Sequence, residues 1–278
     1  MVRGWQPAVE SSLTNIGDRG QAARLALRYA GAFPMGYRTG AGPDEAALDI
    51  VGLHSLSSET SRSVRFYRNP GDASAMLRMK LYSLGAIALS DAVPALENFG
   101  FRVMEELSTP VGGGALGHIQ KFVLEAPIGS NAATIAAAPA TIQRAIARVL
   151  EGLAEDDRFN QLVVELGFDL GEVTLFRALF RYLRQTGLAY GLVTVVDALR
   201  GAPTVAHAII GLFNAHHNPA QKKARAKAAD DADQAIARGL ANVKGIDEDR
   251  ILRLYRAVVK ATLRTNAFAP AAREALAF

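Results

Sequence analysis

The residues of this chain best suited to binding a small molecule lie between Ser83 and Asp91, in the stretch SLGAIALSD. A strand pattern ends where this stretch begins and a helical pattern starts inside it. We therefore expect the unpaired backbone N–H groups of a helix N-terminus at this point. Such amides, together with the helix dipole, can hold a carboxylate. The predicted binding residues are Gly85, Leu89, Ser90 and Asp91.

Each of these residues has its own expected role. Gly85 lets the backbone approach a ligand closely, and Ser90 or Asp91 caps the helix. The amides from Leu89 to Ala92 hold the anion. An ordinary strand-to-helix turn accounts for the same residues, so the loop alone does not establish a function.

Two other motifs resemble cofactor or metal sites but lack the context that such sites need. GGGALG, Gly112–Gly117, matches the dinucleotide pattern G-x-G-x-x-G, but an alternating segment follows it instead of a helix, so we expect a hairpin loop. The neighbours His216 and His217 would point about 100° apart on a helix, and no third ligand has a suitable spacing. A helix C-terminus, where imidazolium complements the dipole, is the favoured interpretation. We predict no catalytic residue, no metal site and no cofactor site in this chain.

Two charged clusters have simpler explanations than binding. QKKARAK, Gln221–Lys227, lacks interleaved aromatic residues and is followed by DDADQ, which favours a solvated helix face over a phosphate-binding patch. DEDR, Asp247–Arg250, fits the first turn of a helix, where acidic residues favour the dipole. Because the formal net charge is only +4 and the charges are mixed in sign, nucleic acid is not the expected partner. A nucleic-acid-binding adaptor that uses residues 221–227 is kept as an alternative function.

The amino-acid composition argues against several further classes of protein. The 278 residues are half apolar and include no cysteine, so neither disulfides nor thiolate chemistry is available. The first residues, MVRGWQPAVESS, lack the apolar region of a signal peptide. No run of about eighteen apolar residues would span a membrane. We expect a cytoplasmic protein.

The predicted binding loop belongs to a β-α-β unit. Leu77, Met79 and Leu81 share one face of a strand, and apolar residues from Leu89 to Phe99 then follow a helical spacing. Gly100 ends the helix and alternation resumes. Two further segments read as strands: Val64–Arg68 and His118–Glu125.

Helical patterns flank this unit on both sides. Pro43 is expected to begin a helix whose buried stripe is Ala47, Leu48, Val51 and Leu56. The Ala-rich stretch 130–141 reads as a connection between domains. Nearly every later segment is helical, including one that starts with a capping box at Asp169 and Glu172. We predict an N-terminal helical lead-in (1–60), an α+β domain (61–130) and a helical domain (131–278).

Four stretches together resemble the large bacterial NAD-dependent glutamate dehydrogenases. LRMKLYSLGAIALSDAVPALENFGFRVMEE (77–106) is similar to their ACT-type unit, and FNQLVVELGFDLGEVTLFRALFRYLRQTG (159–187) is similar to the helical region that follows it. DEDRILRLYRAVVKATLRTNAF (247–268) resembles the segment before their catalytic domain. YAGAFPMGYR, near the start, fits the same family. The resemblance covers nearly the whole chain in order.

The resemblance implies a non-catalytic regulatory and structural segment of such an enzyme. The Gly-rich substrate-lysine region and a valid Rossmann fingerprint are missing from this sequence, so NAD would bind elsewhere in the whole enzyme. The implied partners are the catalytic domain and other subunits of an oligomer. An amino-acid effector is implied as well, because ACT units commonly bind amino acids near the turn that 83–91 forms here. Asp91 would then receive the ammonium group. A pure oligomerisation scaffold is the remaining alternative.

The resemblance and the strand patterns together predict an α+β fold followed by an all-α region. ACT units usually run βαββαβ, whereas here the strand 64–68 precedes the unit and only helix follows Glu125. We therefore predict a four-stranded antiparallel ACT-like (ferredoxin-like) sheet. Its spatial order is Val64–Arg68, Leu77–Leu84, His118–Glu125, Phe101–Ser108. Helices from the β-α-β unit and from about Thr141 onward should cover one face.

Overall fold

The computed structural model describes residues 4–221, 224–269 and 274–278. It divides into two compact units, one up to Asp157 and the other from Arg158 on. Each unit has its own core and is treated separately below. The predicted division at residues 60 and 130 stays a prediction about domains.

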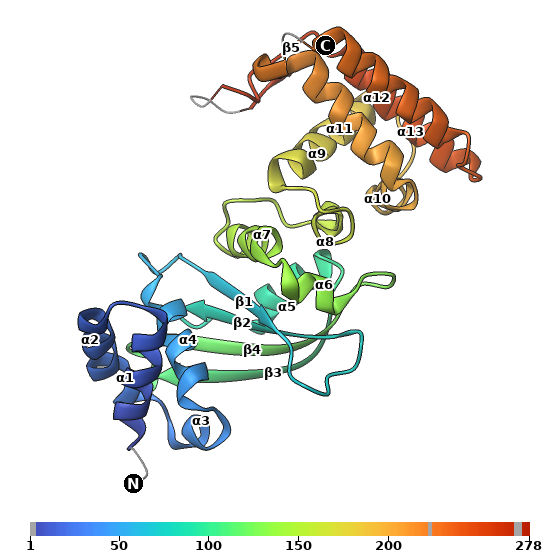
Figure 1. Ribbon diagram of the computed structural model, residues 1–278. Coiled ribbons are helices and arrows are strands. Elements are labelled where there is room, and N and C mark those ends of the chain that lie inside the picture. Colours follow the sequence, from blue (N-terminus) through green and yellow to red (C-terminus); the bar gives the residue numbers. More distant parts are fainter. Residues whose placement is uncertain (1–3, 222–223, 270–273) are drawn as a thin grey trace. The chain divides into compact units, whose positions relative to one another are not determined.

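The first unit is a four-stranded sheet with helices on both faces (Figure 1). Its elements are α1 (Trp5–Ile16), α2 (Arg19–Tyr29), η1 (Ala30–Ala32), α3 (Met35–Gly40), α4 (Pro43–His54), β1 (Ser63–Tyr67), β2 (Met76–Ser83), α5 (Leu89–Asn98), β3 (Arg102–Val111), η2 (Gly112–Gly114), β4 (Gly117–Glu125), α6 (Ala132–Ala137) and α7 (Ala140–Leu150).

The predicted sheet is confirmed. The strand order is β1-β2-β4-β3, and every neighbouring pair is antiparallel. The register shifts between Val103 and Glu105 of β3. The GGGALG loop joins β3 to β4 as a hairpin, and Gly112, Gly113 and Gly114 adopt positive φ angles of 60°, 65° and 99°. A side chain would strain these turns, which explains the run of glycines without a dinucleotide.

The first face of the sheet packs as predicted, on α5 and α7. Residues 130–141 include the helix α6, which is capped by the side chain of Asn131. Ala132 and Ile135 of this helix are buried, and the helix packs against β1 and β2. This stretch therefore contains a packed helix, and its role as a connection between domains stays a prediction.

The second face is covered by the N-terminal helices. Tyr82, Val111 and Ile119 share a core cluster with residues of α1, α2 and α4. The predicted buried stripe of α4 is wrong in part, since Leu48 and Val51 are 39% and 45% exposed. The helix instead buries Ala46, Ala47, Asp49, Ile50 and Leu53.

The second unit is helical as predicted. Its elements are η3 (Arg158–Asn160), α8 (Gln161–Leu166), α9 (Leu170–Gln185), α10 (Leu192–Gly201), α11 (Pro203–His217), η4 (Pro219–Gln221), α12 (Arg225–Leu240), α13 (Ile246–Ala261), β5 (Arg264–Thr265) and β6 (Leu276–Ala277). The Asp169–Glu172 capping box begins α9, and Tyr255 Oη donates to the carbonyl of Phe176 at 3.1 Å between α13 and α9. Over the described residues no single helix could span a membrane by length and composition. Only α10 and α11 pass together, as a pair bent by 98°.

Candidate functional site

The predicted binding loop leaves β2 at Ser83 and enters α5 at Leu89. The N-cap residue of α5 is Ala88, without a side-chain cap, so the expectation that Ser90 or Asp91 caps this helix was wrong. Both side chains lie in the first turn, exposed to solvent, and Ser90 Oγ donates to Asp91 Oδ1 at 3.3 Å. Because neither serves as the cap, both can contact a ligand.

The backbone of the loop offers fewer amides than predicted. The N–H groups of Asp91 and Ala92 already donate to the carbonyl of Ala88, at 3.0 and 3.1 Å. Of the four amides considered, those of Leu89 and Ser90 are left for a carboxylate. Gly85 does leave space, since no atom lies within 4 Å of a Cβ built on it.

Two buried polar groups that sequence reasoning missed belong to the same loop region. Gln120 of β4 donates from Nε2 to the carbonyl of Ile87 at 3.1 Å, while its Oε1 atom is buried without a partner. Ser83 Oγ is also buried and without a partner. Buried polar atoms normally find a partner. The signal in the sequence was Gln120 itself, a polar residue on the buried face of its strand.

A larger polar cluster lies on the opposite face of the sheet. We call it the Asp49 network. The carboxylate of Asp49 is fully buried and accepts from Tyr37 Oη at 2.5 Å and Tyr82 Oη at 2.8 Å. It also pairs with Lys80 Nζ at 2.5 Å and Arg65 Nη2 at 3.3 Å.

Glu45 completes the network one helical turn before Asp49. It bonds Lys80 Nζ at 2.6 Å and also pairs with Arg65. Burial opposes ionisation of Glu45, but its bonds to Lys80 and Arg65 outweigh burial and lower its pKa. Two carboxylates thus meet two cations, and the cluster is formally neutral. It ties α4 to β1 and β2.

Both tyrosine hydroxyls donate to Asp49, and Tyr82 Oη also accepts from Arg65 Nε at 3.1 Å. Burial, then the charge of Asp49, raises the pKa of both Tyr37 and Tyr82 well above the ordinary value. Their hydroxyls therefore stay protonated and point at Asp49. With its lone pairs used by four donors, this carboxylate holds elements together and has no free position for acid–base work.

Sequence reasoning missed this network because the buried stripe that it predicted for α4 contained apolar residues only. In β2, Lys80 shares a strand face with Arg78 and Tyr82, and this alternation does not mark the face as buried. A buried lysine requires a carboxylate. Asp49 is the acidic residue of α4 that becomes fully buried.

The remaining motifs belong to the second unit. His216 and His217 end α11 as predicted, but burial and then the charge of His216 lower the pKa of His217. A charged imidazolium at the helix end is thus the wrong expectation for His217. Residues 222–223 of the basic cluster lie outside the described residues, and Asp247 and Glu248 occupy the first turn of α13.

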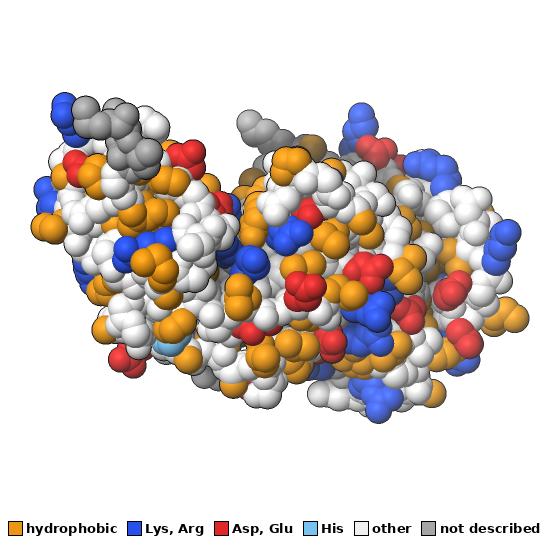
Figure 2. Space-filling view, turned by 90° about the horizontal axis from the view of Figure 1, so that it is seen from below, with side chains coloured by type: hydrophobic (Ala, Val, Ile, Leu, Met, Phe, Trp, Pro, Cys, Tyr) orange, Lys and Arg blue, Asp and Glu red, His pale blue; other side chains and the backbone are white. Residues whose placement is uncertain are grey.

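The surface charges and the candidate metal ligands of the described residues are two further features that could mark a site. On the face drawn in Figure 2, Lys and Arg side chains are mixed with acidic and apolar ones and form no continuous stripe. Among the residues that the structure describes, no three His, Asp or Glu side chains gather as metal ligands would.

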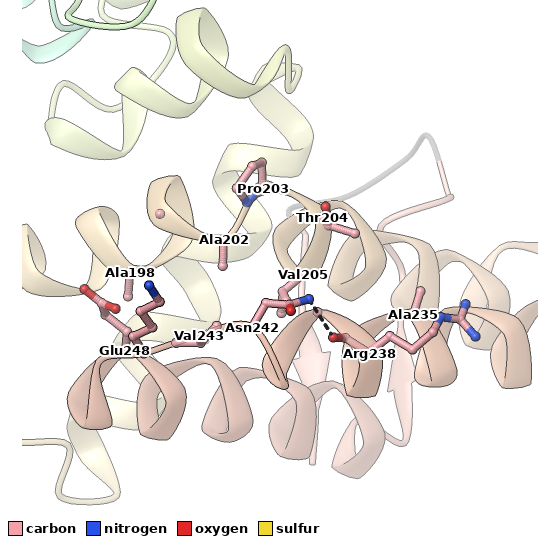
Figure 3. Close-up of a pocket in the computed structure, with 13 residues that line it drawn as sticks. Ala198, Ala202, Pro203, Thr204, Val205, Ala235, Arg238, Asn242, Val243 and Glu248 are labelled. Carbon is pink, nitrogen blue, oxygen red and sulfur yellow. Dashed lines mark hydrogen bonds between the residues drawn. The ribbon is translucent and has the colours of Figure 1, made fainter.

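The second unit contains a pocket of about 400 Å³ between α10, α11, α12 and the start of α13 (Figure 3). Small residues such as Ala198 and Ala202 form much of its lining, and Arg238 and Glu248 lie at opposite ends of it. Asn242 Nδ2 donates to the carbonyl of Arg238 at 3.2 Å. The polar side chains that line this pocket are all exposed to solvent. Hydrogen bonds to them would therefore stabilise a bound ligand little more than hydrogen bonds to water do.

Comparison with known proteins places these parts in one family. Residues 13–56 match helical motif 2 of glutamate dehydrogenase, residues 61–137 match its ACT3 domain, and residues 154–219 match its helical motif 3. The chain is 32% identical over 275 residues to an NAD-specific glutamate dehydrogenase of Pseudomonas aeruginosa. It is 31% identical over 275 residues to one of Mycobacterium tuberculosis, and 28% over 269 residues to one of Halomonas elongata.

These relatives are much longer than the match. Each alignment covers 96% of this chain but only 16–17% of the relative. The predicted resemblance is confirmed by three motifs in the expected order. The chain therefore belongs to the NAD-specific glutamate dehydrogenase family, of which it carries helical motif 2, the ACT3 domain and helical motif 3.

Proposed function

We propose that this chain is a non-catalytic regulatory and structural segment of an NAD-dependent glutamate dehydrogenase. The whole enzyme would convert glutamate, NAD and water to 2-oxoglutarate, ammonia and NADH. The observation that carries the proposal is the order of motif 2, ACT3 and motif 3 along 96% of the chain. NAD would bind in the catalytic domain, which is the proposed partner together with other subunits. A cytoplasmic location suits the cysteine-free composition.

The enzymatic part of the proposal is tested on the whole protein that contains this segment. Purified protein is assayed for NADH formation with glutamate and NAD, and with aspartate as a control substrate. We expect NADH formation that depends on glutamate. A folded whole protein that reduces no NAD with glutamate contradicts the assignment.

The regulatory part of the proposal is an amino-acid effector at the β2–α5 loop. The amides of Leu89 and Ser90 would receive its α-carboxylate, and Asp91, which does not cap the helix, would receive its ammonium group. The open space beside Gly85 leaves room for the backbone of an amino acid. Ser83 Oγ and Gln120 Oε1 supply unsatisfied polar atoms beneath the loop.

Calorimetric titration of the chain with each amino acid tests this site. Gly85→Val should fold normally, because no atom lies within 4 Å of the added Cβ, yet should weaken binding at least about tenfold by filling the ligand's space. Gly31→Val is the matched control, since Gly31 also has no neighbour within 4 Å and lies in η1. Unchanged affinity in Gly85→Val, or no heat with any amino acid, contradicts an effector here and favours the scaffold role.

A further inference from the structure

We propose a second binding site, for a small organic carboxylate, in a pocket on the opposite face of the sheet from the effector loop. The pocket has a volume of about 640 Å³, within the usual range for small-molecule sites. Strands β1, β2, β3 and β4 supply its floor, and α3 with the start of α4 supplies its wall. This proposal does not rest on the proposed enzyme function.

The strand register places three cations in one row across this floor. Arg65 of β1 pairs with Lys80 of β2, and Lys80 pairs with Lys121 of β4. Leu107 of β3 ends the row opposite Lys121. Residues paired across antiparallel strands point to the same face, so all three cations face the N-terminal helices.

Only two of the three cations are neutralised by the protein. Arg65 and Lys80 share Glu45 and Asp49 of α4. Lys121, which is partly buried and lines the pocket, makes no ion pair or hydrogen bond through its side chain within the described part of the chain. Lys121 is therefore the cation of this row that lacks a counter-ion, and a bound anion would supply one.

The other residues that line the pocket indicate what kind of group the carboxylate would be attached to. Tyr37, Tyr67, Pro110 and Ile119 give the pocket aromatic and aliphatic walls, and the Lys80 ammonium lies 5.7 Å from the Tyr37 ring centroid. Glu45, which also lines the pocket, disfavours a second negative group. Burial raises the pKa of Tyr67 to about 12, so its hydroxyl is a neutral donor. A monocarboxylate with an apolar or aromatic body fits this combination.

Ligand-observed NMR and calorimetry on the 278-residue chain test the site. The probes are benzoate, 3-phenylpropionate and hexanoate, each at up to about 10 mM, beside the neutral 3-phenylpropionamide and inorganic phosphate. We expect at least one carboxylate to bind, and 3-phenylpropionamide to bind about tenfold or more weakly than 3-phenylpropionate. No binding of any of the three carboxylates overturns the proposal. Equal binding of the amide overturns it as well, as does phosphate binding that displaces the best carboxylate.

Variants then locate the binding. Lys121→Met should weaken it about tenfold or more, and Leu107→Glu should do the same by giving Lys121 a partner across the strand pair. Leu107 is 58% exposed, so this change is compatible with folding. Lys227→Met, at an exposed lysine of α12, is the matched control and should bind as the parent does. Circular dichroism confirms folding of each variant. Parent-like affinity in both pocket variants overturns the site.

Discussion

Some buried polar atoms make hydrogen bonds that stabilise the fold, whereas others are buried without a hydrogen-bond partner. Asp49 is fully buried with four donors, whereas Ser83 Oγ is buried with none. Burying a hydroxyl without a hydrogen bond lowers the free energy of unfolding. Removing that hydroxyl therefore removes the penalty. The two groups therefore predict opposite mutational effects.

Ser83→Ala should leave the free energy of unfolding unchanged or raise it by up to about 1 kcal/mol. The matched control is Ser12→Ala, because Ser12 is 8% exposed and its Oγ donates to Asp44 Oδ1 at 2.5 Å. Loss of that bond should lower the free energy by about 1 kcal/mol. Urea denaturation followed by circular dichroism measures both. A Ser83→Ala loss as large as that of Ser12→Ala would show that the hydroxyl is paired after all.

One carboxylate in the second unit gives a prediction about pH. Asp233 of α12 bonds Arg256 Nε and Nη2 of α13 at 2.6 and 2.7 Å, and its bonds to Arg256 chiefly lower its pKa from 3.8 to about 2. The folded-state pKa is depressed, so the stabilisation is complete above about pH 4 and is lost as pH falls toward 2. Asp233→Asn should cost about 1 kcal/mol at pH 6, and the cost should shrink below pH 3.8. Urea denaturation of the parent and of Asp233→Asn at pH 6 and below pH 3.8 measures the cost. A cost that is the same at both pH values contradicts the prediction.

At the scale of elements, the Asp49 network is the joint between α4 and the sheet. Removing one partner of a buried ion pair leaves an uncompensated charge, while removing both need not. Asp49→Leu and Lys80→Met should each lower the free energy of unfolding by about 3–5 kcal/mol. Because the double variant leaves Glu45 to pair with Arg65, its loss should be well below the sum of the single losses. Additive losses in urea denaturation would mean that the two side chains act independently.

The same elements show what could be predicted from the sequence. Alternation, a local feature, predicted the strands, and a hairpin placed β1 beside β2, whereas the full order β1-β2-β4-β3 came from the resemblance to ACT units. The face of α4 was misjudged because its stripe was drawn through apolar residues only, whereas the tertiary partners Lys80 and Arg65 make burial of Asp49 favourable. The α5 cap was misjudged because Ala88, which has no capping side chain, leaves no sequence signal. Local chemistry predicted the elements, while long-range charge pairing decided the polar sites.

At the scale of the whole molecule, two units with separate cores predict separate folding. The first unit, up to Asp157, contains the sheet and both of its helical layers. Expressed alone, residues 1–157 should unfold in one cooperative transition with the same urea midpoint as that unit has in the full chain. Residues 61–157, which lack α1–α4, should unfold at much lower urea because the sheet loses the apolar layer on its second face and Lys80 and Arg65 lose Asp49 and Glu45. Equal midpoints for the two fragments would contradict a core shared by the N-terminal helices and the sheet.

The Asp49 network also bears on how this part of the family can evolve. Asp49 lies in the segment that matches helical motif 2, whereas Lys80 lies in the segment that matches the ACT3 domain. Recombination between relatives at the boundary of these two motifs would separate a buried acid from its base. Viable hybrids must therefore inherit both segments from one parent, or carry matched substitutions at positions 49 and 80. In sequences of this family, positions 49 and 80 should therefore change together, even where the rest of the two motifs diverges.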